Sequence, residues 1–264
     1  MSQFKYCFGP VGSWRLGVSL GIDPVSRPEK ICDFDCVYCQ VGQAVAVPPC
    51  RTVYVRPEDI GAELAAFEAP ADYVTFSGRG EPTLAANLPE LLAECGRHRR
   101  EKTAILTNAS LIYSEKIREE LGAFDLVIAK LDAPDAELFM EINRPAAGVC
   151  FDEIVKGLTL FSKGRHNRLA IQTMLIASNK ARVLDLAAHY AAIGPDEVQL
   201  NTPLRPCPEK PLSRAEMDLA ALIITEELRR LGANGIKVLN VYGQKAPKPV
   251  PLSSADTLRR RGKI

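Results

Sequence analysis

Three cysteines near the start of the chain have the spacing of ligands to a metal centre. Cys32, Cys36 and Cys39 follow a Cys-x3-Cys-x2-Cys pattern in the segment CDFDCVYC. Three thiolates on one short loop can bind three irons of a cubane iron–sulfur cluster, whose usual complement is four protein ligands. An iron without a protein ligand is open to a small molecule, as catalytic metal sites keep one position free. The spacing therefore predicts a cluster with one vacant position.

Two other kinds of cysteine site compete with this interpretation. Structural zinc sites usually combine two Cys-x2-Cys pairs, and this chain has one, Cys36 and Cys39. Ferredoxin clusters use shorter gaps and a fourth cysteine that is followed by proline. A zinc protein or a non-catalytic electron carrier is therefore an alternative to an enzyme.

Polar residues interrupt three apolar segments that otherwise have the pattern of buried strands. Lys130 and Asp132 lie two apart in VIAKLDA, Gln199 and Asn201 repeat that spacing in VQLNTP, and Gln172 interrupts AIQTML. Burying an unpartnered charge costs several kcal/mol. All five stand toward the carboxyl ends of their segments, which in parallel barrels form the rim where ligands bind. We expect a common site there; a Lys130–Asp132 ion pair or an exposed sheet edge is the alternative.

The loop SGRGEPT follows another predicted strand and favours the same site. Gly78 and Gly80 let the backbone approach a ligand closely, Glu81 adds a carboxylate, and Pro82 stiffens the exit. Such a loop can bind an ammonium group through its carbonyls and the acid. It is not a phosphate-binding loop of the Walker type, because no Gly-Lys-Ser/Thr follows.

Short apolar segments alternate with helical patterns along most of the chain. Strands are expected at 16–22, 73–76, 103–106, 124–131, 169–176 and 198–200, and helices at 57–68, 88–97, 114–121, 151–163 and 180–193. This alternation implies parallel strands with right-handed crossovers. The expected fold is α/β, a partial (β/α)6 barrel over residues 1–206. Residues 207–264 form a C-terminal extension with a helix at 213–231, a strand at 236–241 and a proline-rich basic end.

Composition limits where the protein works and what it binds. The 264 residues are 47% hydrophobic and 25% charged, as in ordinary globular proteins. No run of about 18 apolar residues or signal-peptide core is visible, and the eight cysteines are irregularly spaced. We therefore expect a cytoplasmic protein without membrane segments. Residues 229–264 hold nine Lys or Arg and one acidic residue, which is typical of a solubilising tail or of a site for RNA.

At the level of motifs, the chain resembles the radical SAM superfamily. More narrowly, it resembles the iron–sulfur oxidoreductase group related to wybutosine-synthesis enzymes. The matching stretches are FGPVGSWRLGVSLGID, KICDFDCVYCQVG, FSGRGEPTL, LTNAS, AKLDA, INRP and VQLNTPLRP. The resemblance implies a partial (β/α)6 barrel with a [4Fe–4S] cluster on Cys32, Cys36 and Cys39, and Tyr38 fits the same pattern.

The resemblance also implies an activity. S-adenosylmethionine (SAM) would meet the SGRGEPT loop with its methionine end, and Thr107, Asn108, Lys130 and Asp132 with the rest; we expect Gln172 and Asn201 to join this site. One electron from the cluster, supplied by a flavodoxin or ferredoxin, would split SAM into methionine and a 5′-deoxyadenosyl radical, which abstracts hydrogen from an unidentified substrate. An RNA (tRNA) modification protein that binds through its basic end is an alternative, compatible with the first if the substrate is a nucleotide in RNA.

Two further groups of residues are candidates for roles around this site. Cys7, Cys50 and Cys207 stand beside prolines or glycines and could meet at the rim as ligands of an auxiliary cluster, although free buried cysteines are common. Arg144 and Arg205 could hold a carboxylate or phosphate of the substrate, since guanidinium groups suit both. A salt bridge from Arg144 to a nearby acidic residue is an equally good explanation. Wybutosine enzymes use several cysteines upstream of the motif, whereas only Cys7 precedes it here, so synthesis of the tricyclic base is not expected.

Overall fold

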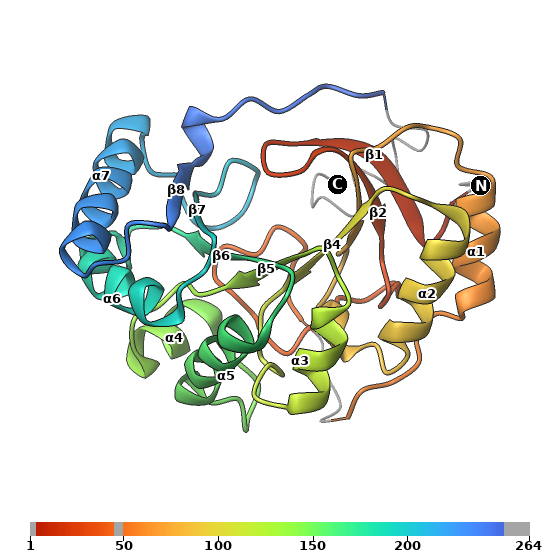
Figure 1. Cartoon of the computed structure of the whole chain (residues 1–264), viewed down its shortest axis with the longest axis horizontal. Helices are drawn as coiled ribbons and strands as arrows, with labels where there is room; N and C mark the ends of the chain where they lie inside the picture. The colour runs from red at the N-terminus through yellow and green to blue at the C-terminus, as the bar shows by residue number, and fades with distance from the viewer. Residues whose placement is uncertain (1–3, 45–49, 251–264) are drawn as a thin grey trace.

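The computed structural model describes residues 4–44 and 50–250. Its centre is one eight-stranded sheet whose strands lie in sequence order (Figure 1). The strands are β1 (Cys7–Ser13), β2 (Gly17–Ile22), β3 (Tyr73–Phe76), β4 (Lys102–Thr107), β5 (Leu126–Lys130), β6 (Arg168–Met174), β7 (Glu197–Asn201) and β8 (Lys237–Asn240). Strands β2 to β8 pair in parallel, and β1 pairs antiparallel with β2.

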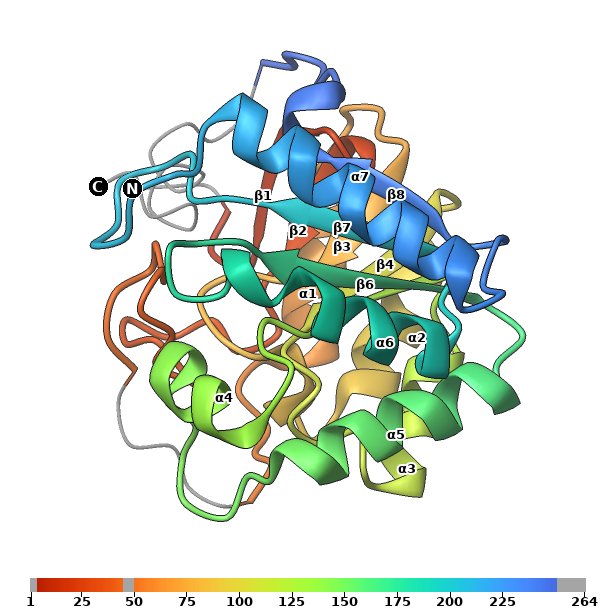
Figure 2. The same cartoon turned by 90° about the vertical axis from the view of Figure 1, so that its left-hand side faces the viewer.

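Helices cover the outer side of this curved sheet (Figures 1 and 2). They are α1 (Pro57–Ala65), α2 (Leu88–His98), α3 (Glu115–Gly122), α4 (Ala136–Asn143), α5 (Phe151–Gly164), α6 (Val183–Ile193) and α7 (Arg214–Arg230). Short 3-10 turns lie at η1 (Pro82–Leu84), η2 (Lys180–Arg182) and η3 (Val241–Gly243). The strand–helix alternation predicted from the sequence is thus confirmed, and the architecture is the expected partial barrel.

Two elements were not predicted, β1 and α4. The segment of β1, CFGPVGS, carries Gly9 and Pro10 in its middle, which hides a strand pattern; proline is tolerated here because β1 is an edge strand. Helix α4 begins at a capped aspartate, since Asp135 accepts a hydrogen bond from the Leu138 amide at 2.9 Å. It ends at Arg144, which has a left-handed φ of 45°. The helix therefore begins shortly after β5 and ends within the INRP segment, at Asn143.

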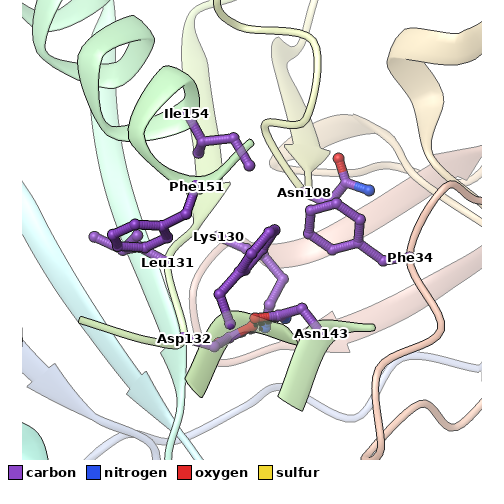
Figure 3. Close-up of a pocket in the computed structure, with 9 residues that line it drawn as sticks. Phe34, Asn108, Lys130, Leu131, Asp132, Asn143, Phe151 and Ile154 are labelled. Carbon is purple, nitrogen blue, oxygen red and sulfur yellow. Dashed lines mark hydrogen bonds and ion pairs between the residues drawn. The ribbon is translucent and has the colours of Figure 1, made fainter. Parts of the chain in front are cut away.

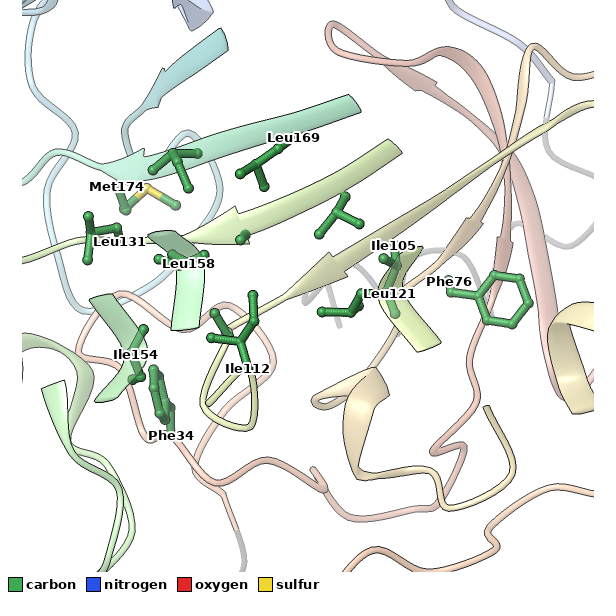
Figure 4. Packing of buried hydrophobic residues seen from close by; sticks show 14 of the residues in the cluster. Phe34, Phe76, Ile105, Ile112, Leu121, Leu131, Ile154, Leu158, Leu169 and Met174 are labelled. Carbon is green, nitrogen blue, oxygen red and sulfur yellow. The ribbon is translucent and has the colours of Figure 1, made fainter. Parts of the chain in front are cut away.

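Side chains alternate between the two faces of the sheet. In β5, Val127 and Ala129 belong to the large core under the helices, whereas Leu126 and Ile128 belong to a smaller cluster on the opposite, inner face. Figure 4 shows part of the large core. Lys130 continues the inner series because strand side chains repeat every second residue. On β5, the inner face is therefore apolar at Leu126 and Ile128 and carries a lysine at the carboxyl end of the strand.

The C-terminal region completes the barrel wall. Helix α7 begins with a capping box between Ser213 and Glu216, and β8 adds a parallel strand to β7. A Cβ atom on Gly12 would lie 1.7 Å from the carbonyl oxygen of Pro247, so the segment after η3 packs directly on the β1–β2 hairpin. Within the described residues, none of the helices has both the length and the apolar character that a membrane crossing requires.

Candidate functional site

The cysteine loop follows β2 at the carboxyl end of the sheet and is held by the INRP segment. The Asp35 amide donates to the Asn143 carbonyl at 3.0 Å, and the Val37 amide donates to the Ile142 carbonyl at 2.9 Å. In the other direction, the Ala146 amide donates to the Asp33 carbonyl at 2.8 Å. These backbone bonds fix the path of the loop, so the INRP residues act as its scaffold.

N–H donors are directed at the sulfurs of this loop. Cys32, Cys36 and Cys39 are free and half-buried. The Asn108 side-chain amide lies 3.8 Å from the Cys32 sulfur, and the Asn143 side-chain amide lies 3.4 Å from the Cys36 sulfur. The Phe34 backbone amide also faces the Cys32 sulfur, at 3.5 Å. Such donors stabilise thiolates and tune a metal centre that they hold.

A buried cation faces the same three thiols. The Lys30 side chain is 5% exposed, and its ammonium donates to the Gly42 carbonyl at 3.1 Å. Burial lowers the pKa of Lys30, but the thiolates of Cys39, Cys32 and Cys36 outweigh it, so the pKa is raised. Burial in turn raises the pKa values of Cys32 and Cys36. The thiols therefore gather around one positive charge in a poorly solvated loop.

This donor set fits an iron–sulfur cluster. Among the described residues, no three His, Cys, Asp or Glu side chains converge on a point that one metal ion could occupy. A cubane does not require such convergence, because each thiolate binds its own iron. The positive charge of Lys30 and the three N–H donors match the negative charge that a thiolate-bound cluster carries.

Asp132 connects the end of β5 to the cysteine loop. It is 2% exposed and accepts hydrogen bonds from the Tyr38 hydroxyl, from the Asn143 side chain at 2.8 Å and from the Met174 amide at 2.7 Å. Its ion pair with Lys130 measures 3.2 Å, and the Lys130 ammonium lies 4.8 Å from the centre of the Tyr38 ring. Burial and, next, the charge of Asp132 raise the pKa of Tyr38. The Lys130–Asp132 ion pair, which the sequence offered as the alternative to a ligand site, is thus present, and both residues line the small space shown in Figure 3.

Glu81 forms a second buried network with the end of β4. Its carboxylate accepts hydrogen bonds from the Asn108 amide at 2.6 Å, from the Thr107 hydroxyl at 2.7 Å and from the Thr83 amide at 3.0 Å. Burial, followed by the nearby charge of Asp33, raises the pKa of Glu81 to about 7. Asn108 in turn donates to Asp33 at 2.6 Å. Glu81 therefore positions Asn108 beside the cysteine loop.

The two glycines of SGRGEPT are required by close packing. Gly78 has a φ of +137°, and a Cβ on it would lie 2.3 Å from the Asp23 carboxyl carbon. A Cβ on Gly80 would lie 1.8 Å from the Ile31 carbonyl oxygen, which also accepts the Glu81 amide at 2.8 Å. The loop thus lies against the residues that lead into the cysteines.

A cavity of about 700 Å³ occupies the inside of the barrel. Its lining includes Gln40 and Val41, directly after Cys39, and Trp14 and Arg15 in the β1–β2 hairpin. Predicted site residues that line it are Gly78, Gln172, Asn201 and Arg205. Asn108, Lys130 and Asp132 instead surround a small space of about 10 Å³ with Phe34 and Asn143 (Figure 3). The predicted site residues are therefore divided between two spaces, and their binding of one common ligand stays a prediction.

One expectation is wrong. Gln199 is fully buried in the middle of β7, where its side chain donates to Glu197 at 2.5 Å, so it is not at the rim. Arg144 is exposed and is not among the residues that line the cavity, and its contact with a substrate stays a prediction. Cys7 is buried in β1, Cys50 is exposed and Cys207 lies half-buried after β7, and an auxiliary cluster on these three also stays a prediction.

Several site residues were missed by sequence reasoning. Lys30, Asn143 and the pair Trp14 and Arg15 all lie in segments that carry the family resemblance. Asn143 could have been found from its place in INRP, because a buried amide there needs partners. The hairpin residues gave no local signal, since only the closure of the sheet brings them to the cavity.

Comparison with known proteins agrees with this geometry. The family model of the radical SAM superfamily matches residues 28–189. The UPF0026 protein slr1464 of Synechocystis is 41% identical over 219 residues, covering 81% of this chain and 80% of that protein. The UPF0026 protein MJ1312 of Methanocaldococcus jannaschii is 36% identical over 243 residues, covering 89% and 75%.

Solved structures with the same fold include two radical SAM enzymes. TYW1 with a lysine-pyruvate adduct bound has a TM-score of 0.61 at 19% identity and covers 79% of this chain and 73% of its own. The enzyme anSMEcpe with bound AdoMet has a TM-score of 0.63 at 18% identity and covers 83% and 64%. The partial barrel is thus the fold of radical SAM enzymes, and the chain belongs to the radical SAM superfamily and to the UPF0026 group of proteins.

Proposed function

We propose that this enzyme binds a [4Fe–4S] cluster on Cys32, Cys36 and Cys39 and cleaves SAM in the adjoining cavity to start hydrogen abstraction from a substrate. The observation that carries the proposal is the set of three half-buried thiols with N–H donors directed at two of their sulfurs. The cavity begins at the residues directly after Cys39. Its volume of about 700 Å³ lies within the ~300–1,000 Å³ range of small-molecule sites.

The chain's own residues would orient and enclose the reactants. The side-chain amides of Asn108 and Asn143 would hold Cys32 and Cys36 through N–H···S contacts. Glu81 accepts the backbone N–H of Asn108, and Asp132 accepts from the side-chain amide of Asn143. Gly78, Gln172 and Asn201 present backbone and amide groups to the cavity. When bound, the reduced cluster supplies one electron to the sulfonium of SAM, which yields methionine and a 5′-deoxyadenosyl radical able to take hydrogen from the substrate.

Proteins with the same fold support this assignment. The structures of anSMEcpe and of SuiB from Streptococcus suis contain AdoMet. Other structures of these two proteins contain a peptide, and TYW1 holds a lysine-pyruvate adduct. These bound molecules differ widely, so the shared fold supports SAM binding and does not identify the substrate of this enzyme. A flavodoxin or ferredoxin as electron donor remains our prediction.

A cysteine substitution tests the proposal. Cys36→Ala, reconstituted anaerobically, is expected to lose the brown cluster absorbance, most bound iron and SAM cleavage by the dithionite-reduced protein. Cys150→Ala is the matched control, because Cys150 is exposed and precedes α5, and it should retain all three properties. SAM cleavage by Cys36→Ala at the normal rate would refute the ligand assignment. One zinc and no iron in anaerobically purified wild-type protein would favour the structural or electron-carrier alternative.

The RNA hypothesis rests on the basic residues of 229–264, of which 251–264 lie outside the described residues. It stays a prediction. Salt-dependent tRNA binding that is lost on deletion of residues 251–264 would support it, and unchanged binding after the deletion would contradict it.

A further inference from the structure

The two carboxylate oxygens of Asp132 have different partners. Oδ1 accepts a hydrogen bond from the Met174 amide at 2.7 Å and pairs with the Lys130 ammonium at 3.2 Å, on the side of β5 and β6. Oδ2 accepts from the Tyr38 hydroxyl and from the Asn143 side chain, the latter at 2.8 Å, on the side of the cysteine loop. Because one charge is shared by both oxygens, the cation on Oδ1 affects how strongly Oδ2 attracts its donors.

The Asn143 side-chain amide faces more acceptors than it has hydrogens. Besides the Asp132 carboxylate, its Nδ2 lies 3.3 Å from the Tyr38 hydroxyl oxygen and 3.4 Å from the Cys36 sulfur. An amide nitrogen carries two hydrogens, so three acceptors compete for them (Figure 3). The amide oxygen, Oδ1, is buried without a hydrogen-bond partner among the residues that the structure describes, so hydrogen bonds hold this amide only through its nitrogen. A stronger bond to Asp132 therefore weakens the N–H···S contact.

The N–H···S contact stabilises negative charge on the Cys36 sulfur. Burial, followed by the charge of Asp132, raises the pKa of Cys36, and the hydrogen bond from Asn143 opposes this rise. Hydrogen bonds to the ligand sulfurs are one of the factors that set the reduction potential of an iron–sulfur cluster. The Asn143 donor would favour the reduced form of a cluster bound there, because that form carries one more negative charge.

We propose that Asn143 is a positioning residue that sets how readily the cluster accepts an electron, and that the Lys130–Asp132 pair controls it. While Lys130 neutralises Asp132, an Asn143 hydrogen is left for Cys36. Without this cation, Asp132 attracts the amide more strongly and the sulfur loses its donor. The inference rests on the proposed function and adds a control of cluster reduction by residues that do not bind iron.

The charges of Lys130 and Asp132 also act on the cluster directly through space. This direct effect persists when Asn143 is replaced by an apolar side chain, whereas the effect that passes through the hydrogen bonds of Asn143 does not. A double-mutant cycle over Lys130 and Asn143 therefore separates the two effects. Asn143→Leu is suited to this cycle because leucine keeps a branched side chain of similar length without the N–H donor.

The experiment measures the reduction potential of the anaerobically reconstituted full chain by redox titration, followed by electron paramagnetic resonance of the reduced cluster. Lys130→Met and Asn143→Leu should each lower the potential by about 59 mV or more, which is a tenfold change in the one-electron equilibrium constant. In the Asn143→Leu background, Lys130→Met should shift the potential by less than half as much as in the wild type. Lys156→Met is the matched control, because Lys156 is exposed on α5 and solvent screens its charge; its potential should be that of the wild type.

Equal Lys130→Met shifts in the two backgrounds would overturn the inference, as would an unchanged potential in Asn143→Leu. If Asn143→Leu takes up no iron, Asn143→Ser, whose side chain is too short to span both acceptors, replaces it in the cycle. Loss of iron from both variants would assign Asn143 to cluster retention and not to control of the potential.

The reduction potential is read without SAM cleavage, so the two proposals can fail separately. A cluster with the expected shifts in a protein that does not cleave SAM refutes only the proposed function. Normal SAM cleavage together with equal shifts in both backgrounds refutes only the present inference. Wild-type protein that takes up no iron refutes both.

Discussion

Replacing Gly80 by alanine is expected to displace the residues that lead into the cysteine loop, although Gly80 is not part of that loop. The new Cβ would lie 1.8 Å from the Ile31 carbonyl oxygen, 2.7 Å from its carbon and 2.9 Å from a Val25 methyl group. Ordinary contact begins at 3.4 Å, so the two backbones must separate by about 1.6 Å. That movement lengthens the Glu81 N–H···O=C Ile31 bond, now 2.8 Å, beyond hydrogen-bonding distance.

The loss of stability follows from these contacts. One lost backbone hydrogen bond costs about 1 kcal/mol, and forced backbone shifts in a packed region cost about 1–3 kcal/mol. Alanine also restricts the unfolded chain more than glycine does, which raises the free energy of unfolding by about 0.5–1 kcal/mol. The net expectation is a decrease of about 1–3.5 kcal/mol in the free energy of unfolding. We also expect less bound iron, because Ile31 directly precedes Cys32.

Urea unfolding of the reduced, metal-free protein and iron analysis after reconstitution check this prediction. Gly96→Ala is the matched control: Gly96 is in α2, and nothing lies within 4 Å of an added Cβ. It should gain about 0.5–1 kcal/mol, as alanine favours helix. A Gly80→Ala protein with wild-type stability and full iron content would show that the close approach of the two loops does not hold the site.

Three further predictions concern single residues. The pKa of Glu81 is about 7 in the folded protein and 4.5 in the reference state, so the folded state binds more protons than the unfolded state between these pH values. The free energy of unfolding should therefore fall by roughly 3 kcal/mol as pH rises through this window. Urea unfolding at a series of pH values should show this fall in the wild type and not in Glu81→Gln. Lys30→Met should lower the reduction potential of the reconstituted cluster, since a buried cation favours the more negative reduced state; an unchanged potential in a redox titration would contradict this. Tyr190→Phe removes the buried hydroxyl bonded to Thr173 at 2.5 Å and should cost about 1 kcal/mol in thermal or urea unfolding, whereas no change would mean that the bond is not net stabilising.

The parts of the site that the sequence predicted are those set by local pattern. The three cysteines lie on one loop, and the alternation along β5 placed Lys130 on the inner face. Strand and helix periodicity also predicted the six parallel strands that carry them. Each of these expectations depends only on residues that are close in sequence.

The remaining parts depend on how distant segments meet. Arg15 and Arg205 come from opposite ends of the chain and share a cavity only because the open sheet curves around it. Arg144 was expected in the site, but the helix before it, α4, was not predicted, and in the structure Arg144 is the exposed, left-handed residue that follows this helix. Glu81 was expected to meet a ligand; its three backbone and hydroxyl partners come from η1 and β4, a contact that periodicity does not encode.

The packing of Gly12 beneath Pro247 has a consequence for biosynthesis. The cysteine loop has all its supporting backbone bonds once residue 146 has been made, whereas the ligand space gains its final wall from Val241 and Ala246. During translation the thiols are therefore organised long before the chamber beside them closes. Among the described lining residues, Val241 and Ala246 are the last to leave the ribosome, and they close the space beside the thiols.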